Sequence, residues 1–196
     1  MLGEGAPQEA GSANQRTRRA VDAVIVLLCG RSFSGKSTVA EVLVPQLPAT
    51  AVSLDAINAE RGLDGGQGIP IKEWSRTNAV ARDRTRRCIA DGITVVVDDT
   101  SSLRFLRDGW RALAGEQGVP LVLVHIDTPV AVSLQWHRTN RNNPSRDDVD
   151  DAVMLAHLES FEPPGGDEEV IRFVPGASDL PDLIAALRLR GGTGDA

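Results

Sequence analysis

The chain has 196 residues, of which 41% are hydrophobic and 24% are charged, as expected for a folded domain with its own core. Its net charge of −6 excludes a general attraction to nucleic acids or anionic membranes, and no apolar run approaches the roughly 18 residues of a membrane span. Two cysteines are too few for a disulfide framework, so we expect reduced cysteines and a cytoplasmic protein.

The two ends of the chain differ in composition from the part between them. Residues 1–19 are rich in Gly, Ala, Gln and Arg without a hydrophobic period, and residues 191–196 have the same character. We expect a disordered leader and a disordered tail. Residues 20–190 are expected to form a single domain.

The most specific motif follows the first predicted strand, Val21–Cys29, and precedes a predicted helix, Lys36–Gln46. Residues 30–37 read GRSFSGKS, a complete G-x-x-x-x-G-K-[ST] phosphate-binding loop. In this motif the backbone N–H groups cradle a β-phosphate, the lysine reaches the β- and γ-phosphates, and the hydroxyl ligates Mg²⁺. We therefore predict ATP or GTP, with Mg²⁺, as ligands. The predicted nucleotide-binding residues are Gly30, Ser32, Phe33, Ser34, Gly35, Lys36, Ser37 and Thr38.

Asp55 lies at the end of the second predicted strand, directly after the range Ala51–Leu54. The carboxyl ends of parallel strands form the ligand crevice of an α/β sheet, so Asp55 is expected on the same rim as the loop. There it is predicted to be a general base that accepts the proton of an attacking hydroxyl. Alternatively, it caps a helical turn that starts at Ala56, and the two roles are compatible. Asn58 and Arg61 follow in a segment expected to contact the acceptor.

Two carboxylates, Asp98 and Asp99, close the third predicted strand, Thr94–Asp98. A carboxylate after such an apolar strand typically holds a metal-bound water in phosphate-loop enzymes. We predict that at least one of them serves Mg²⁺, and the sequence leaves open which one. In the alternative interpretation, Asp99 and Thr100 cap the next helix.

The rest of the chain continues the alternation of strands and helices. The further elements expected are helices over Lys72–Asp91, Leu103–Gln117, Pro129–Asn140, Asp147–Ser160 and Leu180–Leu189, and strands over Leu121–Asp127 and Val170–Val174. This alternation predicts an α/β fold in which a five-stranded parallel sheet lies between two helical layers, as in phosphate-loop NTPases.

A basic segment with a helix on each side is predicted to be a lid at about residues 137–147. Arg138 and Arg141 are its candidate functional side chains, because guanidinium groups could close over a triphosphate and neutralise charge that develops during transfer. Alternatively, they form a solvated basic helix end.

Together these residues resemble the kinase domain of polynucleotide 5′-hydroxyl kinases and of similar small kinases: seryl-tRNA kinases, zeta toxins and chloramphenicol phosphotransferases. The resemblance covers roughly residues 22–162. It implies phosphate and Mg²⁺ binding by Lys36 and Ser37, a catalytic base at Asp55, and Asp99 beside the acceptor or the metal. It also implies that Arg141 and Arg138 are lid arginines.

The predicted function is transfer of the γ-phosphoryl group of ATP or GTP to a hydroxyl of a small molecule, such as a natural product or nucleoside-type antibiotic. An alternative acceptor is a polynucleotide 5′-hydroxyl or a tRNA. The acidic charge, the 4% aromatic content and the lack of an arginine shortly after Asp55 argue against it. An alternative of another class is a nucleotide-dependent regulatory switch. No membrane partner is expected, and the sequence leaves the oligomeric state open.

Overall fold

The computed structural model describes residues 23–63, 68–144 and 148–190. Its centre is a five-stranded sheet in the order β2-β3-β1-β4-β5, in which all neighbouring strands are parallel. The strands are β1 (Ile25–Cys29), β2 (Ala49–Ser53), β3 (Thr94–Asp98), β4 (Leu121–Ile126) and β5 (Val170–Phe173). The predicted α/β fold is therefore confirmed.

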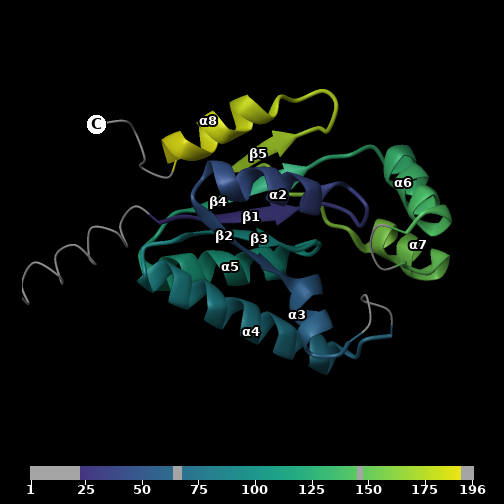
Figure 1. Cartoon of the computed structure of the whole chain (residues 1–196), viewed down its shortest axis with the longest axis horizontal. Coiled ribbons are helices and arrows are strands. Elements are labelled where there is room, and N and C mark those ends of the chain that lie inside the picture. Colours follow the sequence, from purple (N-terminus) through teal and green to yellow (C-terminus); the bar gives the residue numbers. More distant parts are fainter. Residues whose placement is uncertain (1–22, 64–67, 145–147, 191–196) are drawn as a thin grey trace, which may run out of the picture.

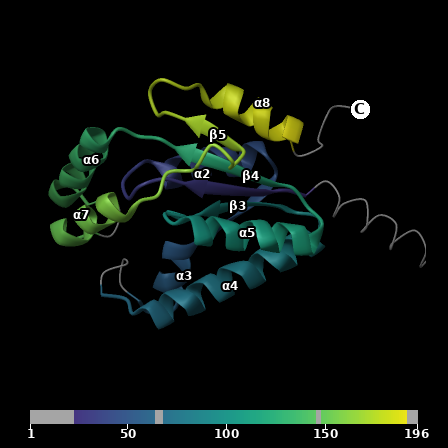
Figure 2. The same cartoon turned by 180° about the vertical axis from the view of Figure 1, so that it is seen from behind.

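Helices cover both faces of the sheet, which gives the three predicted layers (Figure 1). On one face lie α2 (Lys36–Gln46) and α8 (Leu180–Arg190). On the other lie α3 (Leu54–Glu60), α4 (Ile71–Ala90) and α5 (Arg104–Gln117), and the view from behind shows the same arrangement (Figure 2). All five residues of β1 are buried because both faces of this strand are covered, which explains its unbroken apolar sequence.

Two hydrophobic clusters, one on each side of the sheet, hold the layers together. Ile25 and Leu27 belong to the cluster that includes Trp110 of α5, whereas Val26 and Leu28 belong to the cluster on the side of α2 and α8. Successive side chains of a strand point to opposite faces, so β1 contributes to both clusters. This packing fixes the carboxyl end of β1, from which the phosphate-binding loop starts.

Two further helices, α6 (Val130–Asn142) and α7 (Asp151–Ser160), lie beyond the carboxyl ends of the strands instead of on a face of the sheet (Figure 1). They include most of the predicted lid, of which residues 145–147 lie outside the described residues. The predicted leader and tail lie outside them as well. In the described part of the chain, no helix is long and apolar enough to cross a membrane.

Most predicted boundaries differ from the structure by one or two residues, but two elements are shorter than expected. β1 begins at Ile25 instead of Val21, which lies outside the described residues. α7 begins at Asp151 instead of Asp147, because the backbone of its N-cap, Asp150, has a non-helical ψ of 149°.

Helix α3 was not predicted, and its presence corrects the position of Asp55. The strand β2 ends at Ser53, whose hydroxyl accepts a hydrogen bond from the amide of Ala56 at 3.3 Å and so caps α3. Asp55 therefore lies in the first turn of a helix and not at the end of a strand. The alternative in which Asp55 itself caps the turn is wrong, because Ser53 is the cap.

Candidate functional site

The loop between β1 and α2 has a backbone that only its glycines permit. A Cβ atom on Gly30 would lie 2.7 Å from the carbonyl oxygen of Ile126 and 2.8 Å from Oγ of Ser34, so no larger residue fits there. Gly35 has a φ of +92°, in the left-handed region that favours glycine. The amide of Gly30 also donates to the carbonyl oxygen of Thr100 at 3.1 Å, which ties the loop to the segment after β3.

The loop leads into the N-terminus of α2, where the first backbone N–H groups have no partner within the helix. Gly35 is the N-cap and has no side chain that could cap this end, and the first turn contains no acidic residue. Ser37 and Thr38 in this turn are exposed. Oγ of Ser34 is buried without a hydrogen-bond partner in the described ranges. These donors lie at the positive end of the helix dipole and fit a phosphate group.

Lys36 reaches back over the loop from the first turn of α2. The residue is only 8% exposed, and its Nζ donates to the carbonyl oxygens of Gly30 at 3.0 Å and Arg31 at 2.8 Å. The ammonium group is thereby held beside the loop, where it can meet a phosphate bound by the loop amides.

The carboxylates of β3 have different surroundings. Asp98 is the last residue of the strand and pairs in register with Ser53, whereas Asp99 follows the strand. Oδ2 of Asp99 accepts two hydrogen bonds of 3.1 Å, from the amide and the hydroxyl of Ser101. Burial raises the pKa of Asp99 above its usual range, while these hydrogen bonds and the charge of Lys36 oppose the rise. Asp99 is therefore an electrostatic neighbour of the loop lysine.

The alternative helix-capping role of Asp99 and Thr100 is wrong. The N-cap of α5 is Leu103, and the amide of Arg104, the first residue of the helix, donates to Oε2 of Glu162 at 2.7 Å. The carboxylate of Asp99 is thus held by Ser101 and is not used to satisfy a helix end.

The residues present fit a Mg²⁺ ion held together with a phosphate. Within the described ranges, no group of three or more His, Cys, Asp or Glu could hold a metal by itself. Mg²⁺ does not need such a cage, because it is usually bound through one or two carboxylates, substrate phosphates and water. The exposed hydroxyl of Ser37 and the carboxylates of Asp98 and Asp99 supply ligands of this kind, and their metal role stays a prediction.

His157 is a site residue that was not predicted from the sequence. It lies on α7, and its Nδ1 is 2.7 Å from Oγ of Ser32 in the loop, across 125 residues of sequence. Burial and the charge of Lys36 lower the pKa of His157, and the charge of Asp55 opposes this. These electrostatic effects mean that Asp55 and Lys36 both lie near the imidazole, at the same edge of the sheet.

Phe33 packs α6 and α7, the lid helices, against the phosphate-binding loop. This residue is buried in a small cluster with Val149 and Met154, and its ring lies 5.0 Å from that of His137, edge to face. Its φ of 57° is unusual for a residue with a side chain. Phe33 thus serves packing between the loop and the lid, in addition to the nucleotide contact predicted for its backbone.

The two lid arginines have different environments. Arg141 donates to Asp148 at 3.1 Å, to Asp151 at 3.0 Å and to the carbonyl oxygen of Val149 at 3.0 Å, so it joins α6 to the start of α7. Arg138 is exposed on α6 and makes no hydrogen bond or ion pair with another residue of the described chain. Contact of either arginine with a triphosphate stays a prediction.

Asn58 and Arg61, which were predicted to contact the acceptor, are hydrogen-bonded to α4. Asn58 lies on α3, and Arg61 lies at its end. The carbonyl oxygen of the Asn58 side chain accepts from the hydroxyl of Thr77, and Arg61 donates to Thr77 and to Glu73. Asn58 is 1% exposed. These contacts hold α3 against α4, and contact of either residue with an acceptor stays a prediction.

Comparison with known proteins identifies the part of the chain that carries this site. Residues 25–164 match the family model described as an AAA domain. A KTI12 homolog from Arabidopsis thaliana is 28% identical over 146 residues, and the match covers 71% of this chain and 47% of the relative. The chain therefore spans about half the length of this curated relative.

Solved structures share the fold at low sequence identity. Kti12 from Chaetomium thermophilum, in complex with ADP-AlF3, has a TM-score of 0.72 at 11% identity and covers 85% of this chain and 98% of its own. The Mycobacterium tuberculosis APS kinase CysC, in complex with AMPPNP and APS, has a TM-score of 0.63 at 16% identity and covers 88% of this chain and 98% of its own. A gluconokinase from Sinorhizobium meliloti 1021 has a TM-score of 0.57 at 17% identity and covers 88% of this chain and 97% of its own. The chain is a phosphate-loop domain with a kinase-like fold.

Proposed function

Because the chain belongs to the AAA domain family, we propose that its loop binds ATP or GTP with Mg²⁺ and that the protein is a kinase for a hydroxyl of a small molecule. One observation carries this proposal. Nζ of Lys36 is held over the loop by the carbonyl oxygens of Gly30 at 3.0 Å and Arg31 at 2.8 Å. Nδ1 of His157 lies 2.7 Å from Oγ of Ser32 in the same loop, and the charges of Lys36 and Asp55 both act on this imidazole. The loop lysine and a carboxylate thus lie near the same histidine, at the edge of the sheet where the loop and α3 begin.

The donor half of the reaction would use the loop. The amides of the loop and of the first turn of α2 would hold the β-phosphate, and Lys36 would neutralise charge on the β- and γ-phosphates. Ser37 and one of Asp98 and Asp99 would hold Mg²⁺, which screens the negative charge of the phosphates when bound.

The acceptor half would use Asp55. As the hydroxyl oxygen of the acceptor bonds to the γ-phosphorus, the bond from that phosphorus to the bridging oxygen breaks, and the nucleoside diphosphate leaves. Asp55 would take the proton of the hydroxyl. Arg138 and Arg141, in a lid over residues 137–147 of a single domain, would neutralise charge that develops on the transferred group. To do so, Arg141 would exchange Asp148 and Asp151 for the phosphate.

Two observations support a small molecule as the acceptor. The named kinases of similar fold are an APS kinase and a gluconokinase, so this fold does occur in kinases for small hydroxylated molecules. The acidic net charge also favours a small acceptor over a nucleic acid. None of the relatives named above points to an antibiotic acceptor.

A mass-spectrometric screen tests the proposal. Purified protein, ATP or GTP, and Mg²⁺ are incubated with a library of hydroxylated metabolites, and products with one added phosphoryl group are sought. The wild-type protein should form such a product, whereas Lys36→Ala and Asp55→Asn should not. Full transfer by Asp55→Asn to an identified acceptor would disprove the role of Asp55 as base.

A nucleotide-dependent switch is the second candidate function. It is favoured by the hydrogen bonds that Asn58 and Arg61 make with α4, because these are the side chains that a kinase was predicted to use for its acceptor. A switch would hydrolyse the triphosphate slowly without a phosphorylated acceptor and would bind a partner differently in its di- and triphosphate states. Absence of any phosphorylated product together with this difference would favour the switch.

A further inference from the structure

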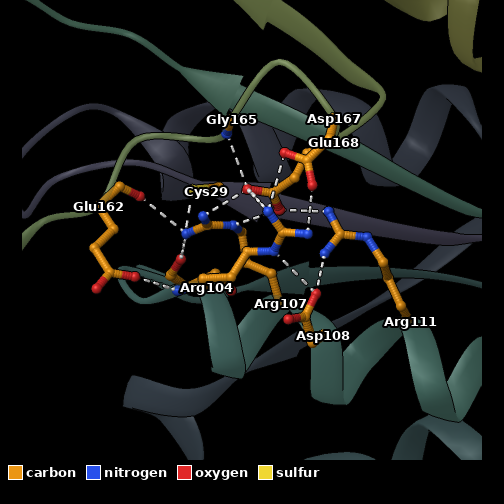
Figure 3. Close-up of polar contacts among 10 residues, drawn as sticks. Cys29, Arg104, Arg107, Asp108, Arg111, Glu162, Gly165, Asp167 and Glu168 are labelled. Atoms are coloured by element: carbon orange, nitrogen blue, oxygen red, sulfur yellow. Dashed lines mark hydrogen bonds and ion pairs between the residues drawn. The ribbon is translucent and has the colours of Figure 1, made fainter.

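A buried ion pair lies beside the candidate site, between α5 and the chain segment that follows the lid. Arg107 and Glu168 have side chains that are each 1% exposed, and Nε and Nη2 of Arg107 donate to the two oxygens of Glu168 at 2.9 and 2.7 Å (Figure 3). Glu168 also accepts from Arg111 and from the amide of Gly165. Since Glu168 holds the edge of the guanidinium group formed by Nε and Nη2, Nη1 of Arg107 is directed elsewhere.

Nη1 of Arg107 joins two loops. It donates at 3.0 Å to the carbonyl oxygen of Ser101, after β3, and at 3.0 Å to that of Glu162, after α7. The thiol of Cys29, at the end of β1, also donates to the carbonyl oxygen of Ser101 at 3.5 Å, and burial raises the pKa of this thiol to about 12, so it keeps its proton. The backbone of Ser101 is therefore held by donors from β1 and from α5.

Ser101 in turn holds Asp99. Ser101 is fully buried and has a φ of 43°, in the left-handed region that residues with a side chain rarely adopt. Such a conformation persists only when the surroundings impose it. In this conformation both the amide and the hydroxyl of Ser101 donate to one oxygen of Asp99. The hydrogen bonds to the carbonyl oxygen of Ser101 thus help to orient the carboxylate of Asp99.

The same loops contact the phosphate-binding loop and the lid. The carbonyl oxygen of Thr100 accepts from the amide of Gly30 at 3.1 Å, and the amide of Glu162 donates to the carbonyl oxygen of Ser102 at 2.8 Å. Phe161, next to Glu162, lies with its ring 4.7 Å from the guanidinium carbon of Arg31 in the phosphate-binding loop. The segment that follows α7 is therefore hydrogen-bonded to the segment that carries Asp99.

We propose that Arg107 is a positioning residue: held by Glu168, it fixes Ser101 so that Asp99 is directed toward Mg²⁺ and phosphate, and it links Ser101 to the segment that follows α7. The inference rests on the proposed function, because it takes Asp99 to serve the metal. A cluster that only stabilises the fold would not need this arrangement, since buried ion pairs are often replaceable by apolar residues without loss of stability.

The test replaces the pair by apolar side chains, in the double variant Arg107→Met/Glu168→Leu, so that neither charge is left buried alone. The matched control is Asp167→Asn, which removes an exposed carboxylate of the same cluster, paired with Arg104 at 2.8 Å. Asp99→Asn is the reference for complete loss of the carboxylate. The affinity for AMPPNP and GMPPNP is measured by calorimetry with and without Mg²⁺, and hydrogen exchange is followed over residues 98–103.

The expected result is a selective loss of the Mg²⁺ effect. In the double variant the gain in affinity on adding Mg²⁺ should fall by about tenfold, as for the loss of an outer partner of a metal ligand. The affinity without Mg²⁺ should stay unchanged, and residues 98–103 should exchange faster in the ligand-free protein. The control should resemble the wild type in each measurement.

Two outcomes would overturn the inference: an unchanged Mg²⁺ effect in a folded double variant when Asp99→Asn loses it, or unchanged exchange over residues 98–103. The proposed function fails in a different way. If the wild-type protein binds neither analogue, or if Asp99→Asn keeps the Mg²⁺ effect, the donor site or its metal ligand is wrong. Hydrogen exchange then still decides whether Arg107 holds Ser101.

Discussion

The hydroxyl of Ser32 lies 2.7 Å from Nδ1 of His157, which joins the phosphate-binding loop to the lid helix α7. Ser32 is the third residue of the loop motif, and His157 lies near the end of α7. Burial lowers the pKa of His157, and Lys36 lowers it further, so the neutral imidazole is the form that suits this contact. The contact therefore makes the docking of α7 sensitive to pH.

The first prediction concerns that sensitivity. A histidine whose pKa is lowered on folding gives its full stability above its ordinary pKa, near 6.5, and loses it as the pH falls below that value. The Tm of wild type minus that of His157→Gln should therefore shrink between about pH 7.5 and about pH 5.5. The groups that face the imidazole, Lys36, Asp55 and Ser32, are common to both proteins.

The other two histidines, His125 and His137, are the same in both proteins. A Tm difference that stays constant with pH would contradict the prediction. Ser32→Ala should give the same trend, because it removes the other partner of the same contact.

The second prediction concerns the anchoring of the lid by Phe33. Phe33→Ala removes a buried ring from the cluster with Val149 and Met154, and it should lower the free energy of unfolding of this region by about 3 kcal/mol. Hydrogen exchange should become faster in α6 and α7 and stay unchanged in β1. The control is Phe105→Ala, since Phe105 is 66% exposed and its loss should cost little. Equal effects of the two variants on the lid would refute this anchoring.

The sequence predicted well what depends on local chemistry. The loop, its strand and its helix are contiguous in the chain, so the motif placed Lys36 and Ser37 correctly relative to the sheet. Helix α3 was missed because Ser53 belongs to a β-rich run and only the fold shows that its hydroxyl caps the next turn. A polar residue between a strand and a helix suits either element, so local pattern does not decide it.

Contacts between distant segments could not be predicted. The pairing of Arg107 with Glu168 spans 61 residues, and that of Ser32 with His157 spans 125. The residues around Arg107 do not show that its side chain is buried, because this burial depends on the segment after α7, which packs against α5 only in the folded chain. Arg61 is the reverse case: it was predicted to contact an acceptor, and the fold brings it to Glu73 and Thr77.

The third prediction compares the two lysines of the chain. Lys36→Ala should lower the affinity for a triphosphate by about a hundredfold, because one charged donor to the phosphates is lost. Lys72, the only other lysine, is exposed on α4, and Lys72→Ala should leave affinity unchanged. Calorimetric titration of both variants measures this difference. Similar affinities for the two variants would mean that the phosphates bind elsewhere.

The fourth prediction concerns Glu168 and acid stability. Hydrogen bonds from Arg107 and Arg111 lower the pKa of Glu168 from 4.5 to about 2. A carboxylate with a lowered pKa contributes its full stability above its ordinary pKa and loses it as the pH falls toward the folded value. Wild type should therefore lose its stability advantage over Glu168→Gln between about pH 4.5 and about pH 2.

At neutral pH the same variant should be less stable by about 3 kcal/mol, because Arg107 is left buried with a neutral partner. Urea unfolding at a series of pH values gives both quantities, and Asp167→Asn, at the exposed edge of the cluster, serves as the comparison. If Glu168→Gln and wild type keep the same difference in unfolding free energy down to pH values near 2, then Glu168 is not an ionised partner of Arg107. The buried pair would then not be the ionic contact that directs Nη1 of Arg107 to the carbonyl oxygen of Ser101.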